Sequence, residues 1–179
     1  VNEVVGVNSN PVAVADAAST FEDTRVVISV LGNDSDVDGD LLTVSGVGVA
    51  GHGVVVLNGD GTVTYTPDVN WFGSDSFTYV VSDGRGGTAT GTVTVTVSGV
   101  NDAPVAVADS VSTDEDTPVV IPVLGNDSDV DGDSLTVSGV GVAGHGTVTN
   151  NGDGTVSCTP DVNWFGSGGL RYVVSDGSG

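Results

Sequence analysis

The chain has 179 residues, of which 24 are Asp or Glu and 3 are Lys or Arg, so its formal net charge is -21. Nucleic acids and anionic membranes are recognised through clustered basic side chains, and this composition therefore excludes both as partners. With 38% hydrophobic residues the chain can still bury a core, whereas its 1 Cys cannot form an internal disulfide, and no apolar run is long enough to predict insertion into a membrane.

Short β-strands are predicted along the first half of the chain. In chain order the candidates are 12–15, 25–30, 41–49, 62–66, 77–81 and 92–97. Val, Thr and aromatic residues alternate with polar ones in the clearest of these runs, which is typical of half-buried strands. Gly, Asn, Asp and Ser separate the runs, and Asn58-Gly59-Asp60-Gly61 is a hairpin turn signal. No segment has a convincing helical stripe.

The same pattern occurs twice. An offset of 93 residues pairs 11–86 with 104–179, and most of the paired positions are identical. Several short strands per copy, separated by turn signals, predict an all-β protein with two tandem immunoglobulin-like antiparallel β-sandwich domains. The second copy stops at the partner of Gly86, so we expect it to lack its last strand. The predicted division is 1–10 for the end of a preceding repeat and its linker, 11–98 for repeat 1, 99–103 for a linker and 104–179 for an incomplete repeat 2.

The large aromatic pairs and the potentially reactive side chains all have structural interpretations. Trp71-Phe72 and its copy Trp164-Phe165 are predicted to fill the two cores. His52 and its copy are flanked by Gly and are predicted to be turn residues. Cys158 stands where the first copy has Tyr65, so it is predicted to be a small buried residue. A catalytic group duplicated in two copies of a repeat is not expected, and we therefore predict that the chain is not an enzyme.

An acidic loop contains the candidate metal-binding residues. The segment 33–40, Asn-Asp-Ser-Asp-Val-Asp-Gly-Asp, recurs unchanged at 126–133. Carboxylates at alternate positions repel one another, and Ca²⁺, which takes roughly six to eight oxygen ligands, would relieve that repulsion. Ser45 and Ser138 stand where an EF-hand loop has its last Glu, and strands flank the loop, so an EF-hand is rejected. The alternative is that these residues are solvated turn residues. The predicted calcium ligands in the two loops are Asp34, Asp36, Asp38, Asp40, Asp127, Asp129, Asp131 and Asp133.

Several short motifs together carry a family resemblance. They are Glu-Asp-Thr at 22–24 and 115–117, Val-Leu-Gly-Asn-Asp-Ser-Asp-Val-Asp-Gly-Asp at 30–40 and 123–133, His-Gly at 52–53 and 145–146, Asp-Gly-Thr-Val at 60–63 and 153–156, Thr-Pro-Asp at 66–68 and 159–161, and Gly-Val-Asn-Asp-Ala-Pro at 99–104. Together they resemble the bacterial cadherin-like and VCBS-type repeats of large secreted calcium-dependent adhesins of the RTX and biofilm type. This resemblance implies cadherin-like sandwiches, Ca²⁺ as the bound ion, an extracellular position at the bacterial cell surface, and a role in cell adhesion or biofilm formation.

In cadherins, calcium lies at the junction of successive domains, and the resemblance transfers those ligands to this chain. It implies Glu22 and Asp23 as upstream acids, Asn101 and Asp102 as linker ligands, and Asp129 with Asp131 as the downstream pair.

The preceding linker, 8–10, has Ser9 in place of Asp102, so we expect a site there to bind calcium more weakly. The sequence leaves open whether calcium bridges domains or is held within each acidic loop.

Calcium shared in this way would stiffen an array whose partners are neighbouring repeats of the same chain. Two other functions stay open. One is a ligand-binding module, for carbohydrate or ice, that uses the Thr-rich face at Thr92, Thr94 and Thr96. The other is a subunit of an extracellular filament, built head to tail by strand donation, in which residues 1–7 of another copy fill the open sheet edge of repeat 2.

Overall fold

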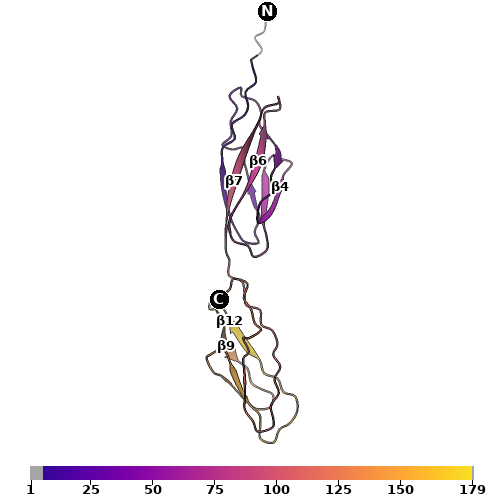
Figure 1. Ribbon diagram of the computed structural model, residues 1–179, viewed down its shortest axis with the longest axis vertical. Helices are drawn as coiled ribbons and strands as arrows, with labels where there is room; N and C mark the ends of the chain where they lie inside the picture. The colour runs from indigo at the N-terminus through magenta and orange to yellow at the C-terminus, as the bar shows by residue number, and fades with distance from the viewer. Residues whose placement is uncertain (1–5, 179) are drawn as a thin grey trace, which may run out of the picture. The chain divides into compact units, whose positions relative to one another are not determined.

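A computed structural model of the chain describes residues 6–178. It contains twelve β-strands, and the chain divides into two compact units, unit 1 (Val1–Val100) and unit 2 (Asn101–Gly179). Figure 1 labels β4, β6 and β7 of unit 1 and β9 and β12 of unit 2. Residues 6–178 contain no helix, and so none that is long and apolar enough to cross a membrane. The prediction of an all-β fold with two domains is confirmed.

Unit 1 is a sandwich of two sheets. One sheet has the strand order β1-β7-β6-β3 and the other has the order β2-β5-β4. All described pairings in unit 1 are antiparallel except that of β1 with β7, which is parallel. The strands are β1 (Asp16–Phe21), β2 (Val26–Ile28), β3 (Thr43–Val47), β4 (Gly53–Leu57), β5 (Val63–Pro67), β6 (Gly73–Ser82) and β7 (Thr88–Ser98).

The expected strand at 12–15 is wrong. Val12 makes only an isolated bridge to Ser35, and the first strand begins at Asp16. Between them, the backbone N–H of Val14 donates to Asp34 Oδ1 at 2.7 Å. A side chain of the acidic loop therefore accepts the hydrogen bond that a strand at this position would donate to a neighbouring strand. Alternation of apolar and polar residues alone did not reveal this competition.

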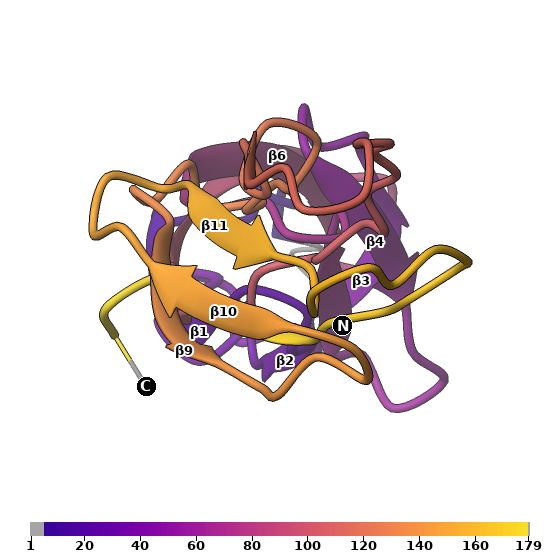
Figure 2. The same ribbon diagram turned by 90° about the horizontal axis from the view of Figure 1, so that it is seen from below.

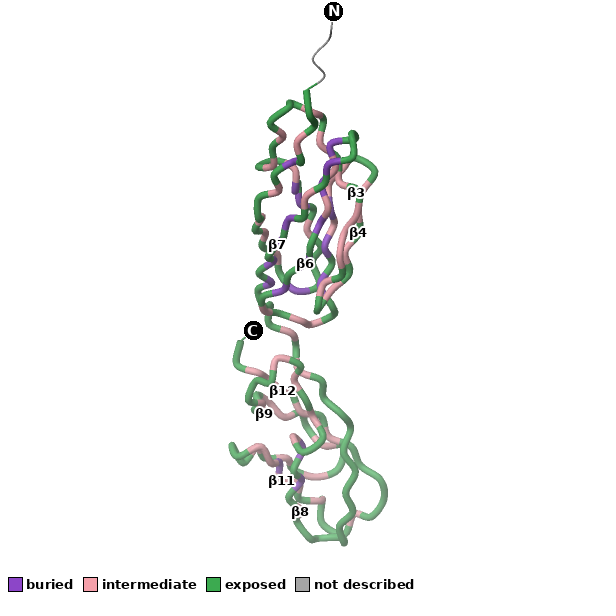
Figure 3. Tube along the Cα trace, turned by 45° about the horizontal axis from the view of Figure 1, so that its top comes forward, coloured by how far each residue is buried: buried purple, intermediate pink, exposed green. Residues whose placement is uncertain are grey.

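β7 shows most clearly how the alternating sequence makes the core. Its Val93, Val95 and Val97 are buried while the intervening threonines are exposed, as a period of two requires. Each such valine, removed from water, stabilises the fold by about 1.5 kcal/mol. Figure 3 shows buried positions concentrated along β6 and β7. The ten buried apolar residues that form this core are Ile28, Val30, Val63, Tyr65, Phe77, Tyr79, Val81, Val93, Val95 and Val97.

Unit 2 repeats part of this plan. Its sheets have the orders β10-β11-β8 and β12-β9, and Figure 2 shows β10 beside β11. Between residues 101 and 178 no described strand corresponds to β7, as expected for a repeat without its last strand, and none corresponds to β1, which was not expected. The buried core is correspondingly small and consists of Ile121, Val123 and Val156. The strands are β8 (Val119–Ile121), β9 (Thr136–Val140), β10 (Thr147–Asn150), β11 (Val156–Thr159) and β12 (Tyr172–Ser175).

The prediction that the aromatic pairs fill the cores holds in unit 1 for Trp71 and is wrong for the phenylalanines. Trp71 packs against the core and stacks on His52 with ring centroids 4.5 Å apart. Phe72 is 54% exposed and Phe165 is 84% exposed. Because the tryptophan turns inward at this tight corner, the next side chain along the chain faces outward.

Candidate metal centre

The acidic loop of unit 1 curls around Asp36. Asp36 Oδ1 accepts the backbone N–H groups of Asp38 at 2.8 Å and Asp40 at 3.4 Å. Gly39 has a φ of 77°, a conformation that a residue with a side chain rarely adopts, and it closes the turn. As a result, one carboxylate oxygen from each of Asp36, Asp38 and Asp40 lies within 4.8 Å of the other two.

This geometry fits a hard divalent cation. Two oxygens bound to one Ca²⁺ lie at most about 5 Å apart, because each is about 2.4 Å from the ion. Asp36 Oδ2 and Asp40 Oδ2 are buried and have no hydrogen-bond partner among the described residues. A buried carboxylate oxygen without a partner is unfavourable unless a cation neutralises it. Asp36, Asp38 and Asp40 are thus suited to hold calcium.

The segment of unit 1 that precedes its first strand is attached to the same loop. The backbone N–H of Ser9 donates to Asp38 Oδ2 at 2.7 Å. Next to it, Asn8 Nδ2 donates to Asp83 Oδ2 at 2.7 Å. Hydrogen bonds from Asn8 and from the backbone N–H groups of Arg85 and Gly87 lower the pKa of Asp83 below its ordinary value. Asp83 therefore stays ionised and holds Asn8 beside the acidic loop.

Unit 2 reproduces the hydrogen bonds of this loop, although Asp129, Asp131 and Asp133 do not form a carboxylate cluster as tight as that of unit 1. Asp129 Oδ1 accepts the backbone N–H groups of Asp131 at 2.9 Å and Asp133 at 3.3 Å. The N–H of Asp102 donates to Asp131 Oδ2 at 2.7 Å, and Asn101 Nδ2 donates to Asp176 Oδ2 at 2.8 Å. Asp102 thus takes the place of Ser9 and brings one more carboxylate to the loop.

The two loops differ in charge as well. Asp102 Oδ2 and Asp129 Oδ2 are buried without a hydrogen-bond partner among the described residues. In unit 1, by contrast, Arg85 Nε lies 2.7 Å from Asp40 Oδ1, and the counterpart of Arg85 in unit 2 is Ser178. The acidic loop of unit 1 therefore has one neighbouring carboxylate fewer, and one neighbouring cation more, than the acidic loop of unit 2.

Two predicted ligands, Asp34 and Asp127, are engaged elsewhere. Asp34 Oδ1 accepts the Val14 N–H and also the Tyr79 hydroxyl at 3.1 Å, and the unit 1 carboxylate cluster does not include it. Asp127 has the same partners in unit 2, Val107 N–H at 2.7 Å and the Tyr172 hydroxyl at 3.3 Å. The structure thus gives both carboxylates a place in a tyrosine network behind the loop.

This network concentrates negative charge. Burial raises the pKa of Asp16 above its ordinary value, and the Asp34 carboxylate adds to that effect. Burial also raises the pKa of the Tyr79 hydroxyl, as do the neighbouring carboxylates. The hydroxyl therefore remains protonated and donates a hydrogen bond at neutral pH.

The two predicted upstream acids have different surroundings. Glu22 is buried, and its Oε1 accepts the backbone N–H of Val100. Its Oε2 is buried without a hydrogen-bond partner in the described chain. Asp23 lies in a turn with φ 54° and accepts the Asn70 N–H at 3.1 Å. The Asp23 side chain therefore links its turn to the segment at Asn70, whereas Glu22 keeps an oxygen that is suited to bind a cation.

Comparison with known protein families gives one match in each unit. Residues 8–96 and 101–179 both match the bacterial Ig domain. The chain belongs to the bacterial Ig domain family. The VCBS-type and RTX classes that the sequence motifs resemble are finer divisions, and the match does not extend to them.

Solved structures similar to these bacterial Ig domains come from different kinds of protein. An endo-fucoidan hydrolase of glycoside hydrolase family 107 is 22% identical over 94% of this chain, with a TM-score of 0.40. The human desmocollin-1 ectodomain is 12% identical over 94% of this chain, with a TM-score of 0.38. The chain spans 27% of the hydrolase and 37% of the desmocollin. TM-scores this low say nothing about the function of this chain. A search among curated proteins finds no match.

Sequence reasoning missed the two residues that hold the linker asparagines of these Ig domains. Asp83 and Asp176 lie far along the chain from Asn8 and Asn101, so loop spacing gave no reason to group them. A signal was available, because both lie in the sequence Val-Val-Ser-Asp-Gly, which recurs at the same offset as the acidic loop. Repetition alone, however, does not indicate what a residue contacts.

Proposed function

We propose that this chain is a calcium-binding, non-catalytic repeat of an extracellular bacterial surface adhesin, in which calcium rigidifies the tandem array for cell adhesion or biofilm formation. The membership in the bacterial Ig domain family supports a structural or adhesive role. The observation that carries the calcium part is the clustering of carboxylate oxygens of Asp36, Asp38 and Asp40, within 4.8 Å of one another.

The contacts of the linkers support the rigidifying part of the proposal. In unit 2 the acidic loop holds the backbone of Asp102 through Asp131, and in unit 1 it holds that of Ser9 through Asp38. A cation bound by the loop would neutralise the carboxylates that anchor the linker. Without a cation, the like charges repel and the anchor weakens. Calcium would thereby restrict the chain segment that precedes each domain.

The backbone on the other side of the second linker is also anchored. Glu22 holds Val100 within unit 1, and Asp131 holds Asp102 within unit 2. Asn101, between these two anchors, is itself hydrogen-bonded to Asp176. Each end of this linker is thus held within its own unit by a carboxylate, and calcium bound at these carboxylates would stiffen the linker.

The test is a calcium titration of the 179-residue chain followed by thermal unfolding and small-angle scattering. Calcium should raise the unfolding temperature and narrow the distribution of distances between the units. Asp129→Asn combined with Asp131→Asn should abolish the effect on unit 2. The matched control, Asp114→Asn with Asp161→Asn, removes the same two charges from exposed positions and should leave the calcium response unchanged.

Three outcomes would overturn parts of the proposal. If stability rises without a change in the distance distribution, the acidic loops hold calcium within each domain and the rigidifying role is wrong. If neither quantity responds at millimolar calcium, the loops are solvated turns and calcium binding is wrong. Equal responses of the loop variant and the charge-matched control would contradict the assignment of Asp129 and Asp131.

A further inference from the structure

Strand β4 is an edge of the sheet β2-β5-β4, and among the described residues no strand pairs with its other side. Its sequence, Gly-Val-Val-Val-Leu, contains no charged residue and no proline, and its register with β5 contains no bulge. Natural edge strands usually have at least one of these features, because an unprotected edge pairs readily with another strand. β4 is thus an unprotected edge of unit 1.

The register with β5 identifies the backbone groups of β4 that face away from the sheet. The Asn58 N–H donates to Thr62 O at 2.8 Å at one end of β4, and the Asp68 N–H donates to His52 O at 3.1 Å at the other end. Hydrogen-bonded pairs recur at every second residue of an antiparallel ladder, so the even-numbered residues of β4 face β5. The N–H and C=O groups of the odd-numbered residues face away from β5, and these residues are Gly53, Val55 and Leu57.

The outer face of this sheet is apolar beside the free edge. Val54 is 60% exposed and Val56 is 51% exposed. Val56 lies opposite Thr64 of β5, and on the other side of Thr64 lies Val27 of β2, which is 58% exposed. Apolar side chains therefore lie along β4 on the face that water contacts.

Unit 2 has a more polar edge at the same place. Its strand β10 has Thr147 and Thr149 where β4 has two exposed valines, and Asn150 where β4 has Leu57. The Asn150 side chain donates to Val137 O of β9 at 2.7 Å. The apolar edge is therefore a property of unit 1 and is not required by the fold of the repeat.

The distribution of charge favours a second copy of the chain as the occupant of this edge. Residues 41–59 contain no Asp, Glu, Lys or Arg, although the net charge of the chain is -21. This segment includes both β3 and β4, which lie beside each other in Figure 3. Two copies with this net charge repel each other, and an uncharged edge is where that repulsion is weakest.

We propose that β4 of unit 1 pairs antiparallel with β4 of a second copy, about a two-fold axis at Val55. In this register Val55 pairs with its own copy and Gly53 pairs with Leu57, so all outward-facing backbone groups of both strands are hydrogen-bonded. The two copies then share one continuous sheet with the strand order β2-β5-β4-β4-β5-β2. This inference is independent of the proposed calcium binding, because no residue of the acidic loop belongs to β4.

The side chains of β4 suit this pairing because the strand is self-complementary. Valines flank Val55 on both sides, so the strand presents the same side chains when its direction is reversed. Val54 of one copy lies opposite Val56 of the other, at positions without hydrogen bonds between the two strands, where side chains approach most closely. Each dimer contains this valine pair twice.

The first test is sedimentation equilibrium of the 179-residue chain in EDTA, so that failure of the calcium proposal does not affect the result. The chain should form dimers with a dissociation constant on the order of 1 mM, because five residues on each side bury little surface. Added NaCl should strengthen the association, because salt screens the repulsion between two acidic chains. A chain that remains monomeric at several millimolar in high salt would overturn the proposal.

The matched variant gives β4 two residues that unit 2 has at this edge. Val54→Thr with Val56→Thr keeps a high strand propensity but removes both valine pairs, so it should weaken dimerisation about tenfold. Val27→Thr removes an equally exposed valine from the same face and should leave dimerisation unchanged. Thermal unfolding shows whether each variant is folded. Equal weakening by the variant and the control would mean nonspecific adhesion and would overturn the proposal.

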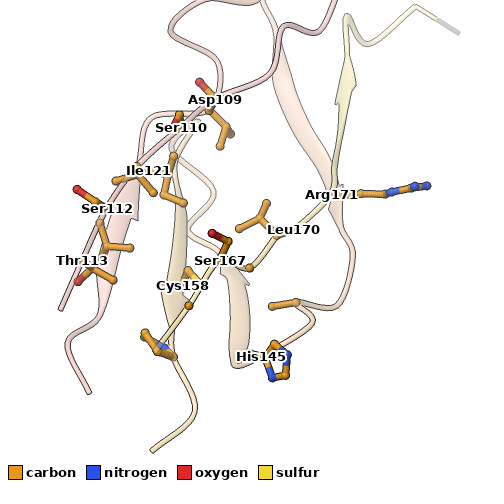
Figure 4. A pocket seen from close by; sticks show the side chains of 18 of the residues that line it. Asp109, Ser110, Ser112, Thr113, Ile121, His145, Cys158, Ser167, Leu170 and Arg171 are labelled. Atoms are coloured by element: carbon orange, nitrogen blue, oxygen red, sulfur yellow. The ribbon is translucent and has the colours of Figure 1, made fainter. Parts of the chain in front are cut away.

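Disulfide exchange tests the register. Cys158 lines a pocket of unit 2 (Figure 4) and is only half-buried, so it is first replaced by serine. Val54→Cys and Val56→Cys are then made in separate chains, which are mixed in a glutathione buffer. Dimers that join the two variants should outnumber each homodimer at least about tenfold, because only directly opposite positions have a Cβ–Cβ distance that suits a disulfide. A statistical mixture of the three products would contradict the proposed register.

Head-to-tail strand donation by residues 1–7 is a different form of self-association. Five of these residues, 1–5, lie outside the described residues. Strand donation builds open filaments, whereas pairing of β4 about a two-fold axis closes at the dimer. Growth beyond the dimer that Val54→Thr with Val56→Thr does not reduce would assign the association to strand donation and would contradict the proposal.

Discussion

The segment Gly73–Thr78 is part of strand β6 in unit 1, whereas its counterpart, 166–171, forms no strand in unit 2. In unit 1 this part of β6 pairs only with β7, while the last four residues of β6 also pair with β3. In unit 2 only those last four, Tyr172–Ser175, remain a strand, and they pair with β9. The segment in unit 2 has lost its partner strand, and it also has Gly168 and Gly169 in place of Asp75 and Ser76. The comparison teaches that a missing partner and the low strand propensity of glycine act together here.

The counterpart of β1 shows the effect of a missing partner with nearly the same sequence in both units. Ala-Asp-Ala-Ala-Ser-Thr at 15–20 includes most of β1, and Ala-Asp-Ser-Val-Ser-Thr at 108–113 is not a strand. β1 pairs with β7 along its whole length. Segment 108–113 has no such neighbouring strand to share backbone hydrogen bonds with, and it does not form a strand although its sequence is nearly the same. The stability of unit 1 should therefore depend strongly on β7.

The largest effect is expected from Val95→Asp. Val95 is fully buried, so the substitution places an unpaired charge in the core of unit 1 and should lower its free energy of unfolding by about 4 kcal/mol. Urea unfolding followed by Trp71 fluorescence in a Trp164→Phe background measures this. Thr94→Asp, on the exposed face of the same strand, is the control and should change it by less than about 0.5 kcal/mol. Similar losses for both would contradict the assigned facing of β7.

The second prediction converts part of the unit 1 core to that of unit 2. Tyr65→Cys should destabilise unit 1 by about 3 kcal/mol, because it leaves a cavity and removes a hydrogen bond to Asp75. Asp75→Gly alone should also destabilise it, because the Tyr65 hydroxyl and the backbone N–H groups of Gly51 and His52 lose their acceptor.

The double variant, Tyr65→Cys with Asp75→Gly, tests whether the two positions are energetically coupled. It should cost less than the sum of the single variants by about 1 kcal/mol, since each change removes the partner of the other. Chemical unfolding of the four proteins completes the cycle. Strict additivity would mean that the hydrogen bond between Tyr65 and Asp75 does not couple the two positions energetically.

The third prediction uses pH to compare the units. Burial of Asp75 opposes ionisation, but hydrogen bonds from the backbone N–H groups of His52, Gly51 and Ser76 and from the Tyr65 hydroxyl outweigh it and lower the pKa of Asp75 below 3.8. A lowered pKa in the folded state contributes stability above pH 3.8 that is lost as pH falls through the folded-state value. Asp75→Asn should therefore destabilise unit 1 at pH 7 and have a progressively smaller effect as pH falls below 3.8. In unit 2, Gly168→Ala should show no such pH dependence. A constant effect of Asp75→Asn from pH 7 to pH 2 would contradict the role of its charge.

The sequence predicted the fold class and the clustering of Asp36 with Asp38, because alternation and loop composition act locally. It did not predict that Asp34 belongs to the tyrosine network, since the position of the Tyr79 hydroxyl depends on how β6 packs behind the loop. Asp83 was missed for the same reason, as its partner Asn8 is brought to it by the fold. In both cases the two partners are far apart in the sequence, and a motif confined to one loop gives no information about such contacts.

The smallest predicted effect concerns the acidic loops and rests on the proposed calcium binding. Arg85 pairs with Asp40 in unit 1, but its side chain is 69% exposed, so Arg85→Ser should change the stability of unit 1 without calcium by less than about 1 kcal/mol. Because calcium would no longer compete with the guanidinium for Asp40, the variant should bind calcium in unit 1 about two- to fivefold more tightly. Titration calorimetry with Asp129→Asn and Asp131→Asn present isolates unit 1. Arg25→Ser, which removes an equal charge from an exposed site, is the control. An equal gain in both variants would mean that net charge, rather than the contact with Asp40, sets the difference between the loops.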